Sequence, residues 1–325
     1  MRPAFFRGWR YPASFHHRAP ALTIPSMDIE RRVLGRTGMA VSVLGFGGSE
    51  TGYGGSAVST VAKILNSALD DGLNLIDTAA CYGDGEEQLG RAISHRRSEF
   101  FLMTKCGHAA GLPGNDWEPR MMAASIDRSL KRLRTDHVDV MQLHSCSERE
   151  LRKGKVIEVL QRAREAGKTR FVGYSGDGGD ALYAVESGVF DTLQISVSIA
   201  DQEAIEMVLS RARAKNIGVI AKRPIANAAW IGEGASDWYS RPYCDRLKKL
   251  DYQFLHEEAA RSIATALRFT LSTPGVHTAI VGTTKPGRWQ QNAALAGQGS
   301  LSPSDYDAIR ARWRQVACRD WTGQM

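Results

Sequence analysis

The sequence predicts an α/β fold, a single (β/α)8 barrel of the TIM type. Short β-rich runs alternate with helical periodicity from residue 41 onward, which is the pattern of repeated βα units on a parallel sheet. These runs are almost wholly apolar, as expected for strands that are covered on both faces. Their number also matches a barrel of about 250 residues. The eight predicted strands cover 41–47, 73–78, 100–105, 138–144, 170–175, 191–196, 218–223 and 277–282.

Helices are predicted between these strands and at the end of the chain. They cover 119–134, 151–166, 203–215 and 302–316. In the first helix, apolar side chains recur every three or four residues from Met122 to Leu133, and Pro119 suits its first turn. Gly167 is predicted to end the second helix.

Two further segments complete the predicted domain, 28–325. Residues 31–43 hold Gly35-Arg36-Thr37-Gly38 between short apolar runs and predict an N-terminal hairpin across the barrel bottom. The segment 225–255, after the seventh strand, is rich in Trp, Tyr and Gly, and a loop this long indicates a lid or specificity element. An open doubly wound sheet would need G-x-G-x-x-G after its first strand, and 44–49 lacks that spacing.

The segment 1–27 differs from the rest of the chain. Its first 26 residues contain four arginines and no Asp or Glu, and they lack the apolar stretch of a secretory signal. We expect an extension that is disordered or lies upstream of the true start at Met27; a transit peptide is the alternative. Without those four arginines the net charge falls from +7 to +3.

Composition narrows the function classes. No run of 18 apolar residues predicts a membrane span, and no Lys/Arg cluster interleaved with aromatics predicts nucleic-acid binding. The five cysteines are scattered without a C-x-x-C, so we expect no disulfide framework or metal site, and a reducing, cytoplasmic compartment. A monomer or small homo-oligomer is expected.

Polar side chains that can handle protons end three of the predicted strands. Asp77 ends strand 2, Lys105 ends strand 3, His144 ends strand 4, and Tyr82 follows Asp77 by five residues. In a barrel the carboxyl ends of the strands form the rim where active sites lie, so these four should be neighbours. Each residue alone has a common structural role, such as a rim salt bridge. Four at matched strand ends predict a catalytic site.

The four residue types suit protonation of a carbonyl oxygen. A phenol has a pKa near 10, and a nearby ammonium such as Lys105 lowers it, which would make Tyr82 a better general acid. Asp77 can pair with Lys105, and His144 can orient the carbonyl. None of these side chains can supply a hydride, so reduction of an aldehyde or ketone would require a nicotinamide cofactor.

The chain resembles the aldo-keto reductase family from about residue 28 to residue 316. The motifs that carry the resemblance are Leu34–Gly38, Asp77–Gly83, Glu87–Gly90, Thr104-Lys105, Gln142–His144, Gly173–Ser175 and Ile280–Thr283. The resemblance implies that Tyr82 is the proton donor, that Lys105 and Asp77 tune it, and that His144 orients the carbonyl.

The resemblance also implies an NADPH/NADP+ site. Its residues would be Gly47, Gly48, Asp77, Ser175, Gln194, Lys222, Arg223, Gly282, Thr283, Lys285, Arg288, Gln291 and Asn292. Two cations near a helix N-terminus suit a 2′-phosphate, which favours NADPH over NADH. Gly176 stands where the family usually has an Asn after the serine that ends strand 5. One contact to the nicotinamide carboxamide is therefore missing or moves to Asp177. Ala221-Lys222-Arg223-Pro224 stands where the family commonly has an aromatic that stacks on the nicotinamide, and Lys222 and Arg223 could instead reach the pyrophosphate.

The substrate is predicted to be a small carbonyl compound. Phe46, Trp117, His144 and Trp230 are the expected pocket residues, although Trp117 and Trp230 serve equally well as packing residues. Two other functions stay open. The chain could be an NADPH-binding regulatory subunit that acts through a protein partner, or an alcohol dehydrogenase that runs mainly in the oxidative direction.

Overall fold

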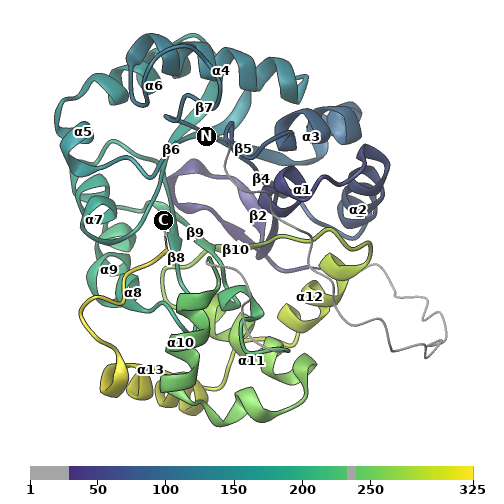
Figure 1. Cartoon of the computed structure of the whole chain (residues 1–325), viewed down its shortest axis with the longest axis vertical. Helices are drawn as coiled ribbons and strands as arrows, with labels where there is room; N and C mark the ends of the chain where they lie inside the picture. The colour runs from purple at the N-terminus through teal and green to yellow at the C-terminus, as the bar shows by residue number, and fades with distance from the viewer. Residues whose placement is uncertain (1–28, 233–238, 325) are drawn as a thin grey trace.

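Eight parallel strands close into one barrel in the computed structural model, which describes residues 29–232 and 239–324. The strand order is β10-β3-β4-β5-β6-β7-β8-β9 (Figure 1). The predicted extension 1–27 lies outside the described residues, as do Gly234 and Trp238 of the segment after the seventh strand. The strands are β3 (Leu44–Gly47), β4 (Leu75–Asp77), β5 (Phe101–Cys106), β6 (Val138–His144), β7 (Thr169–Ser175), β8 (Thr192–Ser196), β9 (Gly218–Lys222) and β10 (Thr278–Val281). The predicted (β/α)8 barrel is confirmed.

The first predicted strand, 41–47, is divided between two sheets. Ala40–Ser42 forms β2, which pairs antiparallel with β1 (Arg31–Val33), and only Leu44–Gly47 joins the barrel. The side chain of Asn74 holds β2 in place, because its Oδ1 accepts from Ser42 N at 2.6 Å and its Nδ2 donates to the Ala40 carbonyl at 2.8 Å. The apolar run did not reveal this break.

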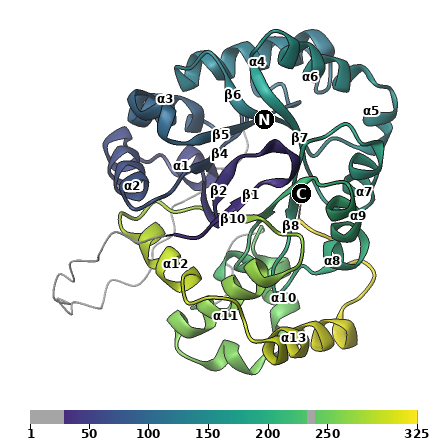
Figure 2. The same cartoon turned by 180° about the vertical axis from the view of Figure 1, so that it is seen from behind.

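The β1–β2 hairpin closes the amino-terminal end of the barrel, as predicted. Figure 2 shows it lying across the opening. Its apolar side chains pack on side chains that point into the barrel, and together they form one buried cluster: Leu34, Met39, Val41, Leu75, Met103, Val140, Ile220 and Ile280. Gly35 has φ +50, and a Cβ there would collide with Gly218 N of β9, so this turn needs glycine.

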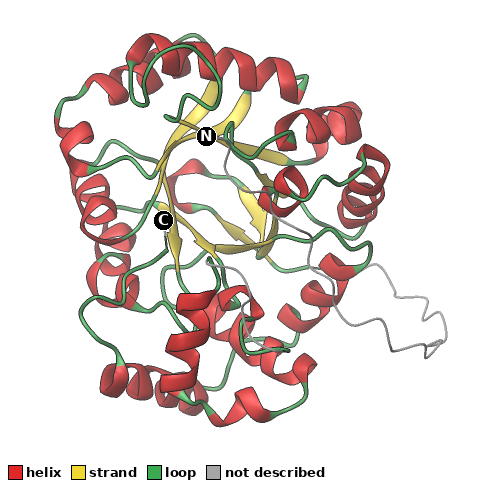
Figure 3. Ribbon diagram, in the orientation of Figure 1, coloured by secondary structure: helices red, strands yellow, loops and turns green. Residues whose placement is uncertain are grey.

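Helices surround the strands in a ring (Figure 3). They are α1 (Ser49–Tyr53), α2 (Val58–Asp70), α3 (Gly85–Ile93), α4 (Pro119–Leu133), α5 (Glu148–Arg152), α6 (Lys155–Glu165), α7 (Gly178–Ser187), α8 (Glu203–Met207), α9 (Leu209–Ala214), α10 (Arg241–Leu250), α11 (Ala259–Ser272), α12 (Arg288–Ala296) and α13 (Pro303–Val316), with short 3-10 turns η1 (Gly35–Thr37), η2 (Ser94–Glu99), η3 (Ala226–Ala228) and η4 (Gln253–His256). No described helix has the length and apolarity needed to cross a bilayer.

Two predicted helices are each a pair of helices. The predicted helix 151–166 divides into α5 and α6 because Gly154 takes φ +75, which a continuous helix cannot contain. The predicted helix 203–215 is interrupted at Val208, whose φ of −118° departs from helical geometry. The amphipathic pattern continues through both breaks, so periodicity could not locate them.

The segment after β9 is more structured than the predicted loop. It contains η3, α10 and η4, and its aromatic residues help to form a second buried core with α11, α13 and the C-terminal tail. The large side chains of this core are Tyr243, Tyr252, Phe269, Trp313 and Trp321. The tail after α13 then returns to the barrel rim near β8 and β9 (Figure 1).

Candidate active site

The four predicted catalytic residues, the tetrad, lie together at the carboxyl end of the barrel: Asp77, Tyr82, Lys105 and His144. Side chains alternate along a strand, so a residue two positions after an inward-facing one also faces inward. Leu75 and Met103 belong to the cluster inside the barrel, which places Asp77 and Lys105 inside the barrel as well. His144 ends β6, and Tyr82 follows β4 in the turn before α3. The strand framework therefore brings all four to one rim.

Lys105 and Asp77 form a buried ion pair. Lys105 Nζ lies 2.6 Å from Asp77 Oδ2 and donates to the Thr78 carbonyl at 2.9 Å. Gln142 Nε2 donates to Asp77 Oδ1 at 3.0 Å, a role that the sequence analysis did not assign. Burial lowers the pKa of Lys105, but Asp77 and then Tyr82 outweigh burial and leave that pKa above its ordinary value. The ammonium therefore stays charged.

Tyr82 lies against this ammonium and the imidazole. Lys105 Nζ is 4.9 Å from the Tyr82 ring centroid, and the centroids of the Tyr82 and His144 rings are 5.6 Å apart. Burial raises the pKa of Tyr82, and Lys105 lowers it by a smaller amount, so the pKa is above 10. Lys105 lowers the pKa of Tyr82, as predicted. The prediction that this pKa falls below its ordinary value is wrong, because desolvation of the buried phenol raises it by more.

His144 is a neutral imidazole. Burial, followed by Lys105 and His108, lowers the pKa of His144 well below 6.5. Its Nδ1 lies 3.3 Å from the Sγ of Cys81, the residue before Tyr82. A neutral ring can donate one hydrogen bond and accept another, which is what orienting a carbonyl oxygen requires.

The four predicted pocket residues have different surroundings. Trp117 stacks edge-on against His108 at 5.3 Å between centroids, and His108 in turn lies 5.5 Å from His144, so Trp117 stays a predicted pocket wall. Trp230 packs on the second core and donates to Ser262 Oγ at 3.0 Å. Phe46 is completely buried between the barrel and its helices. The prediction that Phe46 lines the pocket is therefore corrected.

Strand alternation explains the position of Phe46. A Cβ on Gly45 would contact Leu75 and Ile280, both inside the barrel, so Gly45 and Gly47 face inward and Phe46 faces outward. Three glycines at the ends of β3 and β10, Gly47, Gly48 and Gly282, lie close to neighbouring backbone. A Cβ on Gly48 would lie 3.0 Å from the Asp77 carbonyl oxygen, and one on Gly282 would lie 3.0 Å from that of Gly47.

Ser175 and Gln194 offer a fitting partner for a carboxamide. Ser175 Oγ donates to Gln194 Oε1 at 3.0 Å, and both side chains are buried. Among the described residues nothing accepts a hydrogen bond from Gln194 Nε2, although that atom is buried. An unpaired buried donor at this rim fits a ligand carbonyl such as that of a nicotinamide. A side chain at Gly176 would collide with the Tyr174 ring, which accounts for the missing Asn.

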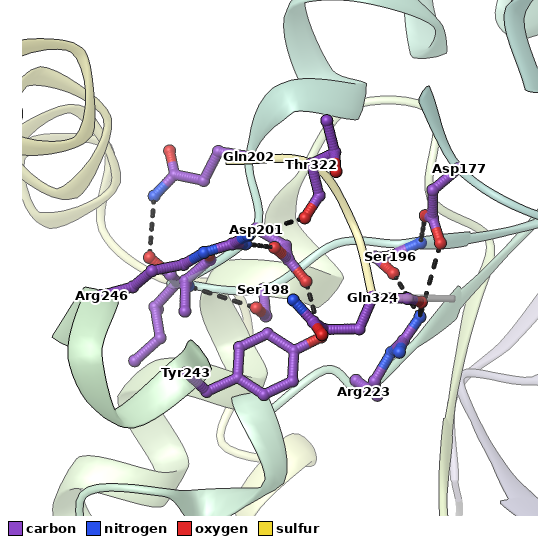
Figure 4. A network of polar contacts seen from close by, with 12 residues as sticks. Asp177, Ser196, Ser198, Asp201, Gln202, Arg223, Tyr243, Arg246, Thr322 and Gln324 are labelled. Atoms are coloured by element: carbon purple, nitrogen blue, oxygen red, sulfur yellow. Dashed lines mark hydrogen bonds and ion pairs between the residues drawn. The ribbon is translucent and has the colours of Figure 1, made fainter. Parts of the chain in front are cut away.

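Asp177 binds two cations on the opposite side of the barrel from Asp77. Its Oδ2 lies 2.8 Å from Lys222 Nζ and 3.4 Å from Arg223 Nη2, and its Oδ1 accepts from Ser196 N at 2.7 Å. Figure 4 shows Arg223 directed at Asp177 and Ser196. Both carboxylate oxygens are therefore occupied. The suggestion that Asp177 replaces the missing carboxamide contact is weakened, and pyrophosphate binding by the two cations stays a prediction.

The C-terminal tail is part of this cluster (Figure 4). Arg223 donates to the Gln324 carbonyl, and Arg246 donates to the Thr322 carbonyl at 2.8 Å and pairs with Asp201. A Cβ on Gly323 would collide with Asp177. Sequence reasoning had no signal for this contact, because it joins residues about one hundred positions apart.

The loop after β10 carries the predicted residues for the adenosine end. Thr283 Oγ1 accepts from Lys285 N at 3.0 Å, and Arg288 begins α12. Burial lowers the pKa of Lys285, and the like charge of Arg288 lowers it further. No acidic side chain of the described residues forms an ion pair with Arg288. Gln291 is exposed and Asn292 is buried on the same helix. Two adjacent cations that repel each other fit a phosphate group.

Glu50 and Tyr53 of α1 also reach the site, although the sequence analysis gave them no role. Tyr53 OH donates to the Cys81 carbonyl at 2.8 Å, and its ring centroid is 5.6 Å from that of Tyr82. Burial raises the pKa of Glu50, and Lys285 lowers it by a smaller amount. Among the described residues, no group of three or more His, Cys, Asp or Glu side chains could hold a metal ion.

Known proteins are similar to this chain over much of its length. The profile of the Aldo/keto reductase family matches residues 43–314. The L-galactose dehydrogenase of Arabidopsis thaliana is 29% identical over 282 residues, 82% of this chain and 88% of that protein. Aldo-keto reductase yakc [NADP(+)] of Schizosaccharomyces pombe is 30% identical over 222 residues, 63% of this chain and 64% of that protein.

A solved structure shares the fold. The aldo-keto reductase AKR11C1 from Bacillus halodurans superposes with a TM-score of 0.76, covering 90% of this chain and 99% of its own, at 23% identity. Identity that low supports the fold alone, whereas the family profile spans most of the chain and includes all four tetrad residues. This protein therefore belongs to the aldo/keto reductase family of oxidoreductases.

Proposed function

We propose that this protein reduces an aldehyde or ketone to an alcohol with NADPH, and that Tyr82 donates the proton. The observation that carries this proposal is the buried Lys105–Asp77 pair against the Tyr82 ring, with the neutral His144 beside it. A bound NADPH would supply the hydride. Tyr82 then transfers its phenolic proton to the oxygen, while Lys105 stabilises the phenolate that remains.

The protonation states favour the reductive direction. Because the pKa of Tyr82 lies above 10, the phenol carries its proton throughout the neutral range, which is the state required of a donor. Because the pKa of His144 lies well below 6.5, its ring stays neutral and can donate to the carbonyl oxygen without adding a charge. With NADPH saturating, the predicted kcat/KM for the carbonyl substrate is therefore flat across neutral pH and declines only at the alkaline pH where Tyr82 loses its proton.

The cofactor groups that fit this site are a carboxamide and phosphates. Ser175 and Gln194 would hold the carboxamide, with Gln194 Nε2 as the donor that lacks a partner. Lys285 and Arg288 would bind the 2′-phosphate of NADPH, and Lys222 and Arg223 the pyrophosphate. The NADP(+) in the name of the Schizosaccharomyces pombe relative supports this cofactor.

Oxidation of an alcohol is the second candidate. The relative from Arabidopsis thaliana is called L-galactose dehydrogenase, which favours a sugar as substrate and the reverse direction. The same four residues would serve, with Tyr82 accepting the proton as phenolate. Since the pKa of Tyr82 is raised, we expect the oxidation rate to increase as the pH rises into the alkaline range.

The test is cofactor absorbance with panels of aldehydes and of sugars, for the parent protein and Tyr82→Phe. The phenylalanine ring keeps the packing against His144 and removes only the hydroxyl group that carries the proton. We expect carbonyl-dependent NADPH oxidation that is lost in Tyr82→Phe while NADPH still binds. Sugar-dependent NADP+ reduction without aldehyde turnover would select the dehydrogenase, and cofactor binding without any turnover would select the regulatory function.

A further inference from the structure

The His144 ring contacts an unusual hydrogen-bonding partner, the thiol of Cys81. Cys81 Sγ lies 3.3 Å from His144 Nδ1, within reach of a hydrogen bond to sulfur. Among the residues the structure describes, no other side chain hydrogen-bonds this ring. The adjacent imidazole of His108 is engaged elsewhere, because its Nδ1 lies 2.7 Å from Asp116 Oδ2.

The protonation states of the two groups favour the thiol as the donor of this contact. Burial raises the pKa of the Cys81 thiol, and Lys105 opposes it only in part, so sulfur keeps its proton at neutral pH. Burial and the neighbouring cations keep the His144 ring neutral. An unprotonated ring nitrogen is a much better acceptor than a thiol sulfur. The S–H group therefore donates a hydrogen bond to Nδ1 rather than accepting one from it.

We infer that Cys81 is a positioning residue that holds His144 in the Nε2–H tautomer by donating its thiol proton to Nδ1. A neutral imidazole carries one N–H, and the hydrogen bond at one nitrogen decides which nitrogen carries it. With Nδ1 as acceptor, Nε2–H is the one donor that remains on the ring. That donor would orient the carbonyl oxygen, so the catalytic consequence of the inference rests on the proposed function.

The fold holds the thiol and the phenol in one rigid turn. Tyr82 N donates to the Ala79 carbonyl at 3.0 Å, and Tyr53 OH donates to the Cys81 carbonyl at 2.8 Å. Because Cys81 and Tyr82 are consecutive, the turn that presents the proton donor also sets the tautomer of His144. A change that removes the thiol should therefore disturb the imidazole without moving Tyr82.

Two substitutions separate hydrogen bonding from packing. Cys81→Val fills a similar volume without a donor, and Cys81→Ser keeps a donor. Cys318→Ser changes an exposed cysteine in the tail and serves as the control. The tautomer is read from long-range 1H–15N NMR spectra of the full chain labelled with 15N-histidine, with His144 assigned by comparison with His144→Gln. Steady-state kcat and KM with NADPH and an aldehyde are measured in parallel.

We expect Nε2–H in the parent, Cys81→Ser and Cys318→Ser proteins, and a tautomer mixture in Cys81→Val. In Cys81→Val, kcat should fall about five- to tenfold, the size of one lost hydrogen bond, with the KM for NADPH unchanged. An Nδ1–H tautomer in the parent, or an unaltered Nε2–H signal in Cys81→Val, would overturn the inference. A tautomer shift in a protein that turns over no carbonyl compound would support the inference and refute the proposed function.

Discussion

Lys105 and Lys222 occupy matching positions in the barrel and have opposite pKa shifts. Each lies near the carboxyl end of its strand and faces the inside of the barrel. Lys105 follows Met103 by two residues in β5, and Lys222 follows Ile220 by two residues in β9. Burial lowers the pKa of both. Asp77 and Tyr82 nevertheless raise the pKa of Lys105 above its ordinary value, whereas the pKa of Lys222 falls to about 8.

The difference comes from how the carboxylates are shared. Asp77 pairs with one cation, Lys105, while Asp177 is shared between Lys222 and Arg223, 2.8 and 3.4 Å away. Two cations on one carboxylate leave a surplus positive charge, and the charge of Arg223 adds to burial in lowering the pKa of Lys222. On the Asp77 side of the barrel one negative charge therefore balances one positive charge, which suits proton transfer. The Asp177 side is unbalanced and suits an anionic group such as a pyrophosphate.

The largest expected effect is on turnover, in Lys105→Met against the matched variant Lys222→Met. Loss of Lys105 removes the charge that stabilises the Tyr82 phenolate, so kcat should fall roughly a thousandfold, within the range of acid–base contributions. Lys222→Met should keep kcat within about tenfold and weaken NADPH binding instead, because only one charge–anion contact is lost. Stopped-flow single turnovers and NADPH fluorescence titrations measure the two quantities. Equal losses of turnover in both variants would contradict the division of roles.

The next effect is on stability, in Asp177→Asn. This change leaves two largely buried cations without their carboxylate, which should reduce the free energy of unfolding by about 3–5 kcal/mol. Urea denaturation followed by circular dichroism measures the loss. Adding Lys222→Met to Asp177→Asn removes one of the unpaired charges and should restore part of the stability. A double variant less stable than Asp177→Asn would argue against charge imbalance as the cause.

Arg288 differs from both lysines, because it forms no ion pair with a carboxylate of the described residues. Replacing it by Ala should raise the Kd of NADPH by about 10- to 100-fold, the value of one or two charge-assisted contacts to a phosphate. The Kd of NADH should change little, because NADH lacks the 2′-phosphate. Isothermal titration calorimetry with both cofactors decides between these results. An equal increase in the Kd of NADPH and of NADH would show that Arg288 does not bind the 2′-phosphate.

The smallest expected effect is a pH dependence of cofactor binding. Lys222 loses its positive charge as the pH rises through about 8, so the NADPH Kd should increase several-fold between pH 7 and pH 9. Lys105 stays charged across this range because its pKa is raised. In Lys222→Met the increase should disappear. A dependence that persists in this variant would come from another group.

Sequence reasoning was most accurate where local pattern and strand geometry act together. The apolar runs predicted the eight barrel strands, and the polar residues at their ends predicted that Asp77, Lys105 and His144 meet at one rim. The same reasoning failed for Phe46, because the alternation of Gly45 and Gly47 was not used to decide which face it occupies. It also missed the breaks at Val43 and Val208, which leave the apolar pattern intact.

Periodicities a few residues long were enough to predict the order of the strands and the types of residue at their ends. The distribution of charges and protons among these residues could be seen only in the folded molecule. Burial outweighs Lys105 in setting the pKa of Tyr82, Asp177 is shared by two cations, and Cys81 touches His144. Those properties depend on distances and desolvation between strands that lie far apart in the chain, which no local pattern encodes.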